Sequence, residues 1–154
     1  MTAPSHEPST RIREAIAALE RASLKKTPQR LAIVRAFAGD PTHPTAQQIF
    51  DRLRRTMPTM SFATVYNTLA ALETAGACRT LRLGDNDSAR FDPNVAPHDH
   101  AVCDRCRAVR DVTRRPAKAP ASLELDVGSD DFEVRAVERV YRGLCAECRA
   151  KSAK

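Results

Sequence analysis

The sequence lacks the features that would direct a chain into or across a membrane. None of its apolar runs approaches the roughly 18 residues that a membrane-spanning helix needs. Its N-terminus also lacks the charged, then apolar, then small-residue series of a secretory signal peptide. These absences predict a soluble, cytoplasmic protein with no membrane partner. Disulfide frameworks are rare in that setting, so the five cysteines are expected to be metal ligands or reactive thiols.

Net positive charge is missing from the second half of the chain. Residues 1–84 hold 12 Lys and Arg against 6 Asp and Glu, whereas residues 85–154 hold 13 of each. Four of the five cysteines lie in this neutral half. A basic half followed by a metal-rich half is typical of a nucleic-acid-binding domain joined to a metal-binding one. Charge alone is equally compatible with a solvated basic surface that has no partner.

Apolar residues in the first half recur at helical spacing, which predicts helices over residues 11–22, 27–39, 45–57 and 61–76. Helix-capping residues open the last three, and glycines stand near two of their ends. Segment 77–92 follows as two short strands around the turn GDNDS. Helices followed by a hairpin are the order of a winged helix-turn-helix. The residues expected to face its core include Leu31, Val34, Ala38, Phe62, Val65, Leu69 and Leu72.

The helix predicted over 61–76 has an outer face suited to reading DNA. Small and polar residues would point away from the core near its N-terminus, after the cap Ser61. In a major groove an asparagine can read adenine, and alanine or threonine methyls can touch a thymine methyl. An ordinary exposed helix face would look the same. The residues of this face are Ala63, Thr64, Tyr66 and Asn67.

The cysteines form two C-x-x-C pairs, Cys103 with Cys106 and Cys145 with Cys148. Each pair can place two thiolates on one tight turn, and two such turns make the closed tetrahedral site of structural zinc. Two redox pairs are the alternative, but they need a thioredoxin-like strand and helix that the pattern lacks. Cys78 stands outside both pairs and is expected to be a small apolar residue of the wing.

Four cysteines complete the predicted zinc site, so His98 and His100 are not needed as zinc ligands. In a strand both would project to one face, with Asp99 on the other. Imidazoles combined with carboxylates favour a divalent ion such as Fe(II), Mn(II) or Zn(II). Further candidate ligands are His43, Asp92 and Asp111. Spacing alone does not select the two aspartates as ligands. For His43, a surface position beside a helix cap is the alternative.

The motifs as a set resemble the ferric uptake regulator (Fur) family. The matching segments are LKKTPQRLAIVRAF, HPTAQQIFDRL, SFATVYNTLAALETAG, RFD, HDHAVCDRCRAVRDV and GLCAEC, in order over residues 24–148. The resemblance implies an α+β homodimeric repressor, not an enzyme. Its winged-helix DNA-binding domain would span 1–92, with 1–10 a flexible tail. A small α/β dimerisation domain with the four-cysteine zinc would span 93–154.

Within the family, the sequence looks most like the peroxide-sensing PerR type. That type binds a regulatory Fe(II) or Mn(II) through three histidines and two aspartates, which match His43, Asp92, His98, His100 and Asp111. Iron sensors usually carry glutamate where Asp92 stands, and zinc sensors add a cysteine beside the histidine pair. The resemblance implies that peroxide oxidises His43 or His98, after which the metal and the DNA are released.

Lys25, Lys26 and Arg30 are expected to contact DNA phosphates, and the resemblance places Lys25 and Lys26 where relatives touch a narrow A·T-rich minor groove. The operator is expected to be an A·T-rich inverted repeat. The sequence departs from the family in two places. No histidine precedes the last C-x-x-C, so a third metal site is not expected, and two prolines fall in segment 113–131, where relatives have a helix.

Three other functions compete with this one. His98, His100 and one aspartate could form the two-histidine, one-carboxylate iron site of an oxygenase, although the pattern shows no apolar substrate pocket. The chain could be a zinc-ribbon interaction module with a merely solubilising basic half. Within the family, it could be an iron- or manganese-responsive uptake repressor that does not sense peroxide.

Overall fold

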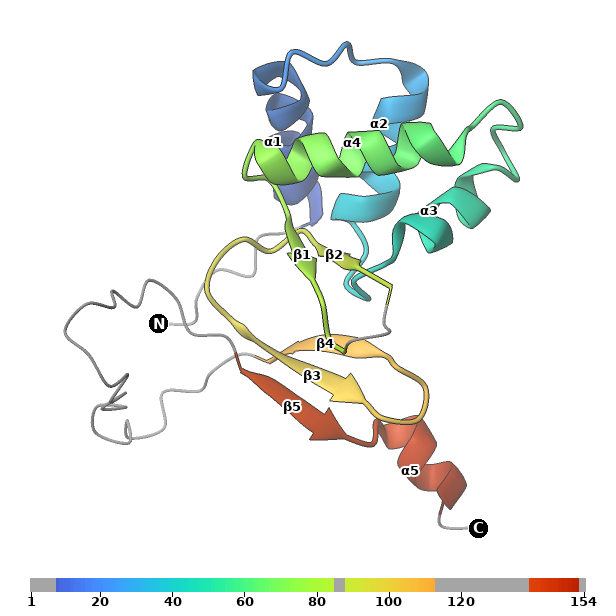
Figure 1. Cartoon of the computed structure of the whole chain (residues 1–154), viewed down its shortest axis with the longest axis vertical. Helices are drawn as coiled ribbons and strands as arrows, with labels where there is room; N and C mark the ends of the chain where they lie inside the picture. The colour runs from blue at the N-terminus through green and yellow to red at the C-terminus, as the bar shows by residue number, and fades with distance from the viewer. Residues whose placement is uncertain (1–7, 85–87, 113–138, 153–154) are drawn as a thin grey trace, which may run out of the picture. The chain divides into compact units, whose positions relative to one another are not determined.

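The computed structural model describes residues 8–84, 88–112 and 139–152. The chain divides into two compact units, Met1–Ala96 and Pro97–Lys154. Figure 1 shows a helical first unit with a small hairpin and a second unit built on a sheet. The elements of the first unit are α1 Pro8–Arg21, α2 Pro28–Ala38, α3 Ala46–Leu53, α4 Phe62–Thr74, β1 Arg79–Leu81 and β2 Arg90–Asp92. Those of the second are β3 Asp99–Cys103, β4 Val109–Val112, β5 Val140–Gly143 and α5 Ala146–Ser152.

Side-chain caps fix where α2, α3 and α4 begin, as predicted. The hydroxyl of Thr27 accepts from the backbone N–H of Arg30, and Pro28 occupies the first turn of α2. Thr45 and Gln48 form a complete capping box at α3, and Ser61 caps α4. These bonds satisfy backbone donors that the first turn of a helix leaves without partners.

The first unit buries one apolar core where its helices meet. Its largest fully buried members come from all four helices. Phe37 and Ile33 are buried although the stripe predicted for α2 ran through Leu31, which is only half-buried. The prediction is confirmed for Val34 and Ala38 and wrong for Leu31. Because α2 is in contact with α1, α3 and α4, its buried surface is wider than one stripe. The central residues are Leu19, Ile33, Val34, Phe37, Ile49, Val65, Leu69 and Leu72.

The helices differ from the sequence prediction at the end of α3, at the start of α1 and in the exposure of Phe62. Helix α3 ends at Leu53, whereas the prediction extended to residue 57. Helix α1 begins at Pro8, within the segment 1–10 expected to be a tail, because proline suits the first turn. Phe62 is 42% exposed instead of buried. As the first residue of α4 it reaches past the core, and its ring packs edge-on against Phe50, with centroids 5.9 Å apart.

The predicted hairpin is present as an antiparallel pair of β1 and β2, in which Arg79 faces Asp92 and Leu81 faces Arg90. Gly76 lies between α4 and this pair with a φ of 70°, a conformation that glycine adopts without strain. Asp92 is the last residue of β2, as expected of a residue that ends the wing.

Strand β3 is central in the described sheet of the second unit, where β4 pairs with it antiparallel and β5 pairs with it parallel. Strand β3 begins at Asp99, so His98 precedes the strand that was expected to contain it. The segment 113–131, in which two prolines depart from the family pattern, lies outside the described residues. No helix in the described ranges is long and apolar enough to cross a membrane.

Candidate metal sites and nucleic-acid surface

All four paired cysteines meet at one end of the sheet of the second unit. Cys103 ends β3, and the tight turn after it carries Cys106, closed by a bond from the N–H of Arg107 to the carbonyl of Cys103 (2.9 Å). Gly143 of β5 lies beside Cys103 in the parallel register. Two residues further on, Cys145 therefore reaches the same place, and the first turn of α5 brings Cys148.

The sulfur positions fit one tetrahedral zinc ion. Ligand atoms of the four cysteines lie within 4.8 Å of one another, and the sulfurs of Cys106 and Cys145 are 3.7 Å apart. Four sulfurs at the usual Zn–S distance of ~2.3 Å would lie ~3.8 Å from each other. All four residues are free cysteines, so none is withheld in a disulfide.

The pKa values of two of these thiols are shifted in opposite directions. Backbone hydrogen bonds from the Cys106 and Cys145 N–H groups lower the pKa of Cys103 to about 6, so its thiolate predominates at neutral pH. Burial, followed by hydrogen bonds with the other three thiols, raises the pKa of Cys148 to about 12. A cation bound beside Cys148 would reverse this, because a coordinating thiol loses its proton.

Cys78 has none of the properties of a sensor thiol. It is 3% exposed and its sulfur lies 3.7 Å from the carbonyl oxygen of Leu69. Burial, then the nearby charges of Glu73 and Asp92, raise its pKa to about 12. A protonated, buried thiol is a poor nucleophile, so Cys78 is an apolar core residue that immediately precedes the wing strand.

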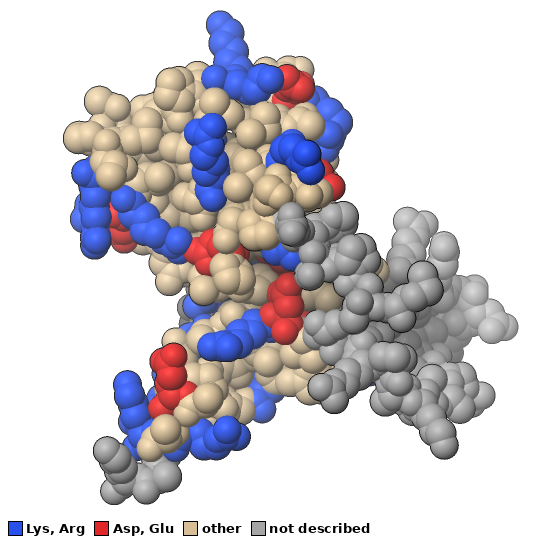
Figure 2. Space-filling view, turned by 180° about the vertical axis from the view of Figure 1, so that it is seen from behind, with Lys and Arg blue, Asp and Glu red and all other residues tan. Residues whose placement is uncertain are grey.

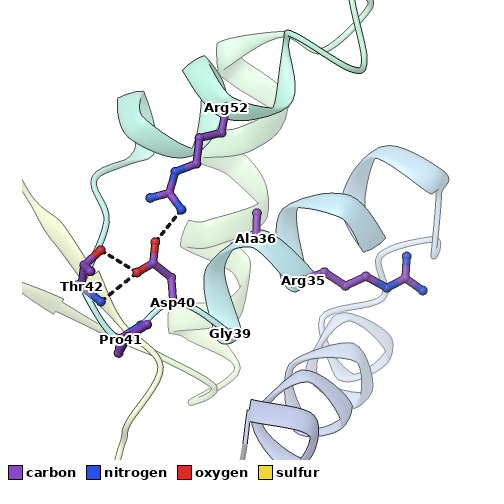
Figure 3. A pocket seen from close by; sticks show the side chains of 7 residues that line it. All are labelled: Arg35, Ala36, Gly39, Asp40, Pro41, Thr42 and Arg52. Atoms are coloured by element: carbon purple, nitrogen blue, oxygen red, sulfur yellow. Dashed lines mark hydrogen bonds and ion pairs between the residues drawn. The ribbon is translucent and has the colours of Figure 1, made fainter.

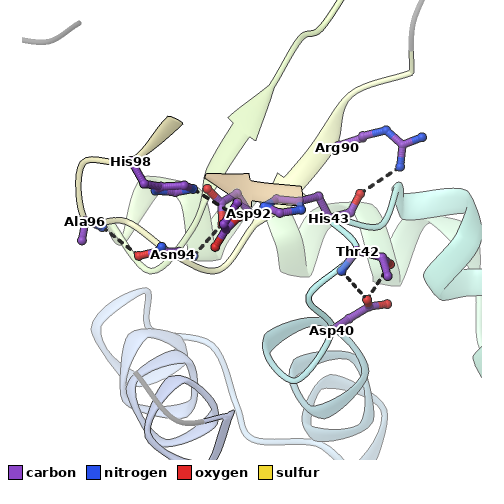
Figure 4. Close-up of polar contacts among 9 residues, drawn as sticks. Asp40, Thr42, His43, Arg90, Asp92, Asn94, Ala96 and His98 are labelled. Carbon is purple, nitrogen blue, oxygen red and sulfur yellow. Dashed lines mark hydrogen bonds and ion pairs between the residues drawn. The ribbon is translucent and has the colours of Figure 1, made fainter. Parts of the chain in front are cut away.

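The first unit brings His43 and Asp92 together. His43 lies in the loop between α2 and α3 and Asp92 at the end of β2, and their Nε2 and Oδ1 atoms are 3.5 Å apart. The exposed fractions of the two residues are 1% and 0%. The loop is fixed to β2 by Arg90, whose Nη1 donates to the carbonyl of His43 (3.1 Å), as Figure 4 shows. Asp92 also accepts from the N–H of Asn94 at 2.7 Å.

The second unit brings His98, His100 and Asp111 together. Asp111 of β4 faces His100 across the antiparallel pair. His98 Nε2 lies 3.4 Å from Asp111 Oδ1, and the two imidazole centroids are 4.4 Å apart. His98 and His100 thus share a face, as their spacing predicted. Each unit therefore carries part of the predicted ligand set, made of nitrogen and oxygen donors without thiols, which suits Fe(II) or Mn(II).

The predicted base-reading residues lie on the outer side of α4. Ala63, Tyr66 and Asn67 are exposed, and Tyr66 is 53% exposed. Thr64 is half-buried, and its hydroxyl is 2.8 Å from that of Ser61, so it contributes to the helix cap. Tyr66 stacks on Phe62, with centroids 6.4 Å apart. The sequence reading missed this aromatic row, although the i, i+4 spacing of Phe62 and Tyr66 could have revealed it.

The predicted phosphate-contacting residues lie around the start of α2, with Lys25 and Lys26 exposed and Arg30 half-buried. Lys26 forms an ion pair with Glu20, and Arg30 donates to the carbonyl of Lys25 at 3.0 Å. Figure 2 shows Lys and Arg side chains over much of the helical unit. Lys25 is thus the most available of the three positive charges.

Sequence reading also missed Asp40 and Arg90, which hold the loop that carries His43. Asp40 followed two residues later by Thr42 is a recognisable turn signal, because aspartate commonly accepts from the backbone two residues on. No local pattern identifies Arg90, because its contact with His43 joins residues 47 positions apart.

A family model described as the ferric uptake regulator family matches residues 21–127. The chain is 35% identical over 140 residues to the peroxide-responsive repressor PerR of Staphylococcus aureus strain Mu50, covering 91% of this chain and 93% of the relative. An iron-containing ferric uptake regulator structure from Francisella tularensis aligns at 27% identity and TM-score 0.66, covering 82% and 95% of the two chains. The Helicobacter pylori regulator Fur aligns at 18% identity and TM-score 0.66, covering 94% and 95%, which supports the fold alone.

Proposed function

Because the chain belongs to the ferric uptake regulator family, whose members are dimeric, DNA-binding, metal-responsive repressors and not enzymes, we propose that it is a repressor that senses hydrogen peroxide. Its DNA-binding domain would comprise residues 1–92 and its dimerisation domain residues 93–154. The observation that carries the proposal is the thiol-free set of three histidines and two aspartates, with aspartate and not glutamate at position 92.

Cys103, Cys106, Cys145 and Cys148 would hold a structural zinc ion. The 3.7 Å sulfur separation supports a closed four-thiolate site, in which zinc has no open position for chemistry. Such an ion stabilises the end of the sheet and α5 permanently. The cysteines would therefore maintain the dimerisation domain and take no part in sensing.

The regulatory ion would be bound by His43 and Asp92 of the first unit together with His98, His100 and Asp111 of the second. One ion shared between the units would favour one relative orientation of the two domains, and hence the DNA-competent state. The short His43–Asp92 and His98–Asp111 distances support this, since each unit already holds its donors close together.

Bound Fe(II) would supply the redox chemistry of sensing. In the overall reaction one oxygen atom of hydrogen peroxide would be added to the imidazole of His43 or His98, and the other would leave as water. The protein's own part is to hold those rings close to the carboxylates of Asp92 and Asp111. An oxidised imidazole is a poorer ligand, so the ion would dissociate and would no longer link the two units. The 35% identity to a peroxide-responsive repressor supports the proposal. A plain iron- or manganese-responsive repressor is the alternative that the test below distinguishes.

Two winged helices of a homodimer would bind an A·T-rich inverted repeat. The exposed face of α4, with Ser61, Ala63, Thr64, Tyr66 and Asn67, would lie in the major groove. Lys25, Lys26 and Arg30 would approach the backbone beside it. Exposure of Tyr66 and Asn67 supports the first assignment, and the exposed charge of Lys25 supports the second.

The test uses zinc-loaded protein and DNA fragments that its Mn(II) form selects from a random pool. Binding is measured for the Fe(II) and Mn(II) forms, with and without a low dose of peroxide. We expect the Fe(II) form to release DNA and the Mn(II) form to keep it. If neither form responds, the chain is an iron- or manganese-responsive repressor. Equal sensitivity of both forms would rule out iron-based sensing.

A further inference from the structure

The loop that carries His43 has an unusual backbone. His43 has a φ of 53°, in the left-handed region that side chains with a β-carbon rarely adopt. Such a conformation persists only where the surroundings hold it, and it commonly marks a functional position. The contacts that hold this loop therefore determine where the imidazole of His43 points.

Asp40 anchors the start of the loop. Its Oδ1 accepts from the backbone N–H of Thr42 at 2.8 Å and from the Thr42 hydroxyl at 2.5 Å. Its Oδ2 lies 2.6 Å from Nη1 of Arg52 on α3. Figure 3 shows these partners converging on the Asp40 carboxylate at the edge of a surface hollow. Although burial alone would raise it, the pKa of Asp40 is lowered by the bonds from Thr42 and Arg52, so the carboxylate stays charged.

The end of the loop is anchored to the wing. Phe91 donates its backbone N–H to the carbonyl of Pro44 at 3.0 Å, and Thr45 forms a β-bridge with Arg90. Arg90 also holds the carbonyl of His43 (Figure 4). Strand β2 ends one residue after Phe91, at Asp92. The loop is thus attached to α3 at its start and to the Asp92 strand at its end.

We propose that Asp40 and Arg52 are positioning residues that set the direction of the His43 imidazole toward Asp92. The proposal rests on the proposed function, in which His43 is a ligand of the regulatory ion. Neither Asp40 nor Arg52 is among the residues proposed above to bind the ion or the DNA. Their effect passes through the turn at Thr42 to the left-handed backbone of His43, so the ligand pair is ordered before any ion binds.

A purely structural role for Asp40 would have different consequences. The Asp40–Arg52 pair connects the end of α2 to α3, so it could simply stabilise the core of the first unit. Its loss would then lower the melting temperature without changing the environment of His43. A positioning role instead changes the imidazole's surroundings and its metal affinity in protein that is fully folded.

The experiment compares Asp40→Asn and Arg52→Gln with Asp51→Asn. Asparagine can keep the acceptor for Thr42 while removing the charge that faces Arg52. Asp51 lies on α3 beside Arg52 and serves as a matched control, because its ion pair with Arg54 at 3.5 Å is solvent-exposed. Arg52→Gln removes the same ion pair from its exposed partner, so it remains informative if Asp40→Asn folds poorly.

Zinc-loaded variants are examined before and after Mn(II) is added. We expect Asp40→Asn and Arg52→Gln to shift the imidazole NMR signal of His43 and to weaken Mn(II) binding by about three- to tenfold, at or below the range for residues that orient metal ligands. Asp51→Asn should do neither. After Fe(II) and peroxide, the oxidised fraction of the His43 peptide should fall relative to that of the His98 peptide.

An unshifted His43 signal with unchanged Mn(II) affinity in both folded variants would overturn the proposal. The proposal would also be overturned if the loss of Mn(II) binding in each variant only matched its fraction of unfolded protein. His43→Ala separates this failure from failure of the proposed function. If His43→Ala leaves Mn(II) binding intact, His43 is not a ligand. The NMR signal of His43 in Mn(II)-free protein still reports whether Asp40 sets its position.

Discussion

The four-cysteine site and the histidine–aspartate set differ in how the chain assembles them. All four cysteines lie within the second unit, on a strand end, a turn and the first turn of a helix. The histidines and aspartates are divided, with His43 and Asp92 in the first unit and the other three in the second. A site within one unit suits a permanent ion that stabilises a fold. A ligand set divided between units suits an ion whose arrival and loss must change the protein.

Removing one cysteine should have the largest effect. Cys145→Ser leaves three thiolates, so zinc binding, worth roughly 10–16 kcal/mol in small zinc domains, should be lost together with the fold of the second unit. Zinc content by mass spectrometry and the dimer fraction by ultracentrifugation check this. The control Cys78→Ser should keep its zinc and lose at most about 2 kcal/mol of stability. A stable, dimeric, zinc-free Cys145→Ser protein would contradict the account.

Removing one histidine from either unit should have the next largest effect. His43→Ala and His100→Ala should each lower Mn(II) affinity by about 100-fold or more, since a ligand matters at least as much as the groups that orient it. The zinc content and the melting temperature should change little. Competition with a fluorescent chelator measures both affinities. Two independent ions would instead let each variant keep one normal site.

Lengthening one carboxylate should have a smaller effect. Asp92→Glu keeps the charge and the donor type, so metal-dependent DNA binding should persist. Its longer chain displaces the ligand, and we expect the peroxide response to slow by about tenfold. The rate of DNA release after peroxide checks this. Release at the wild-type rate would show that Asp92 does not distinguish a peroxide sensor from other family members.

The smallest effects are expected at the exposed face of α4 and at Lys25, in the first unit. Asn67→Ala should lower discrimination between operator and random DNA by about 1 kcal/mol, because it removes a contact with a base edge. Lys25→Ala should weaken binding to all sequences and reduce the slope of log affinity against log salt by about 0.9. Binding titrations at several salt concentrations separate the two. Identical behaviour of the variants would contradict the division into base-reading and phosphate-contacting residues.

Residue types and their spacing along the chain predicted most of the helices, the hairpin and the cysteine site. The caps Thr27, Thr45 and Ser61 and the hairpin ending at Asp92 follow from residue type and spacing over short distances. The repeated C-x-x-C motif predicts that the four cysteines meet, although 38 residues separate the two pairs. Phe62 was misplaced because helical periodicity cannot tell where a core ends. The contact of Arg90 with His43 joins residues 47 positions apart, and that of Asp40 with Arg52 joins a loop to a different helix. Neither contact follows from the spacing of residues within one helix or strand.

The central claim is that peroxide is sensed at ligand histidines and not at cysteines. Mass spectrometry of peptides from Fe(II)- and Mn(II)-loaded protein, exposed to low peroxide, tests it most directly. The account predicts the addition of one oxygen atom to a peptide containing His43 or His98 in the Fe(II) form, and no such addition in the Mn(II) form. Oxidation confined to peptides with Cys103, Cys106, Cys145 or Cys148, or equal oxidation of both forms, would contradict it.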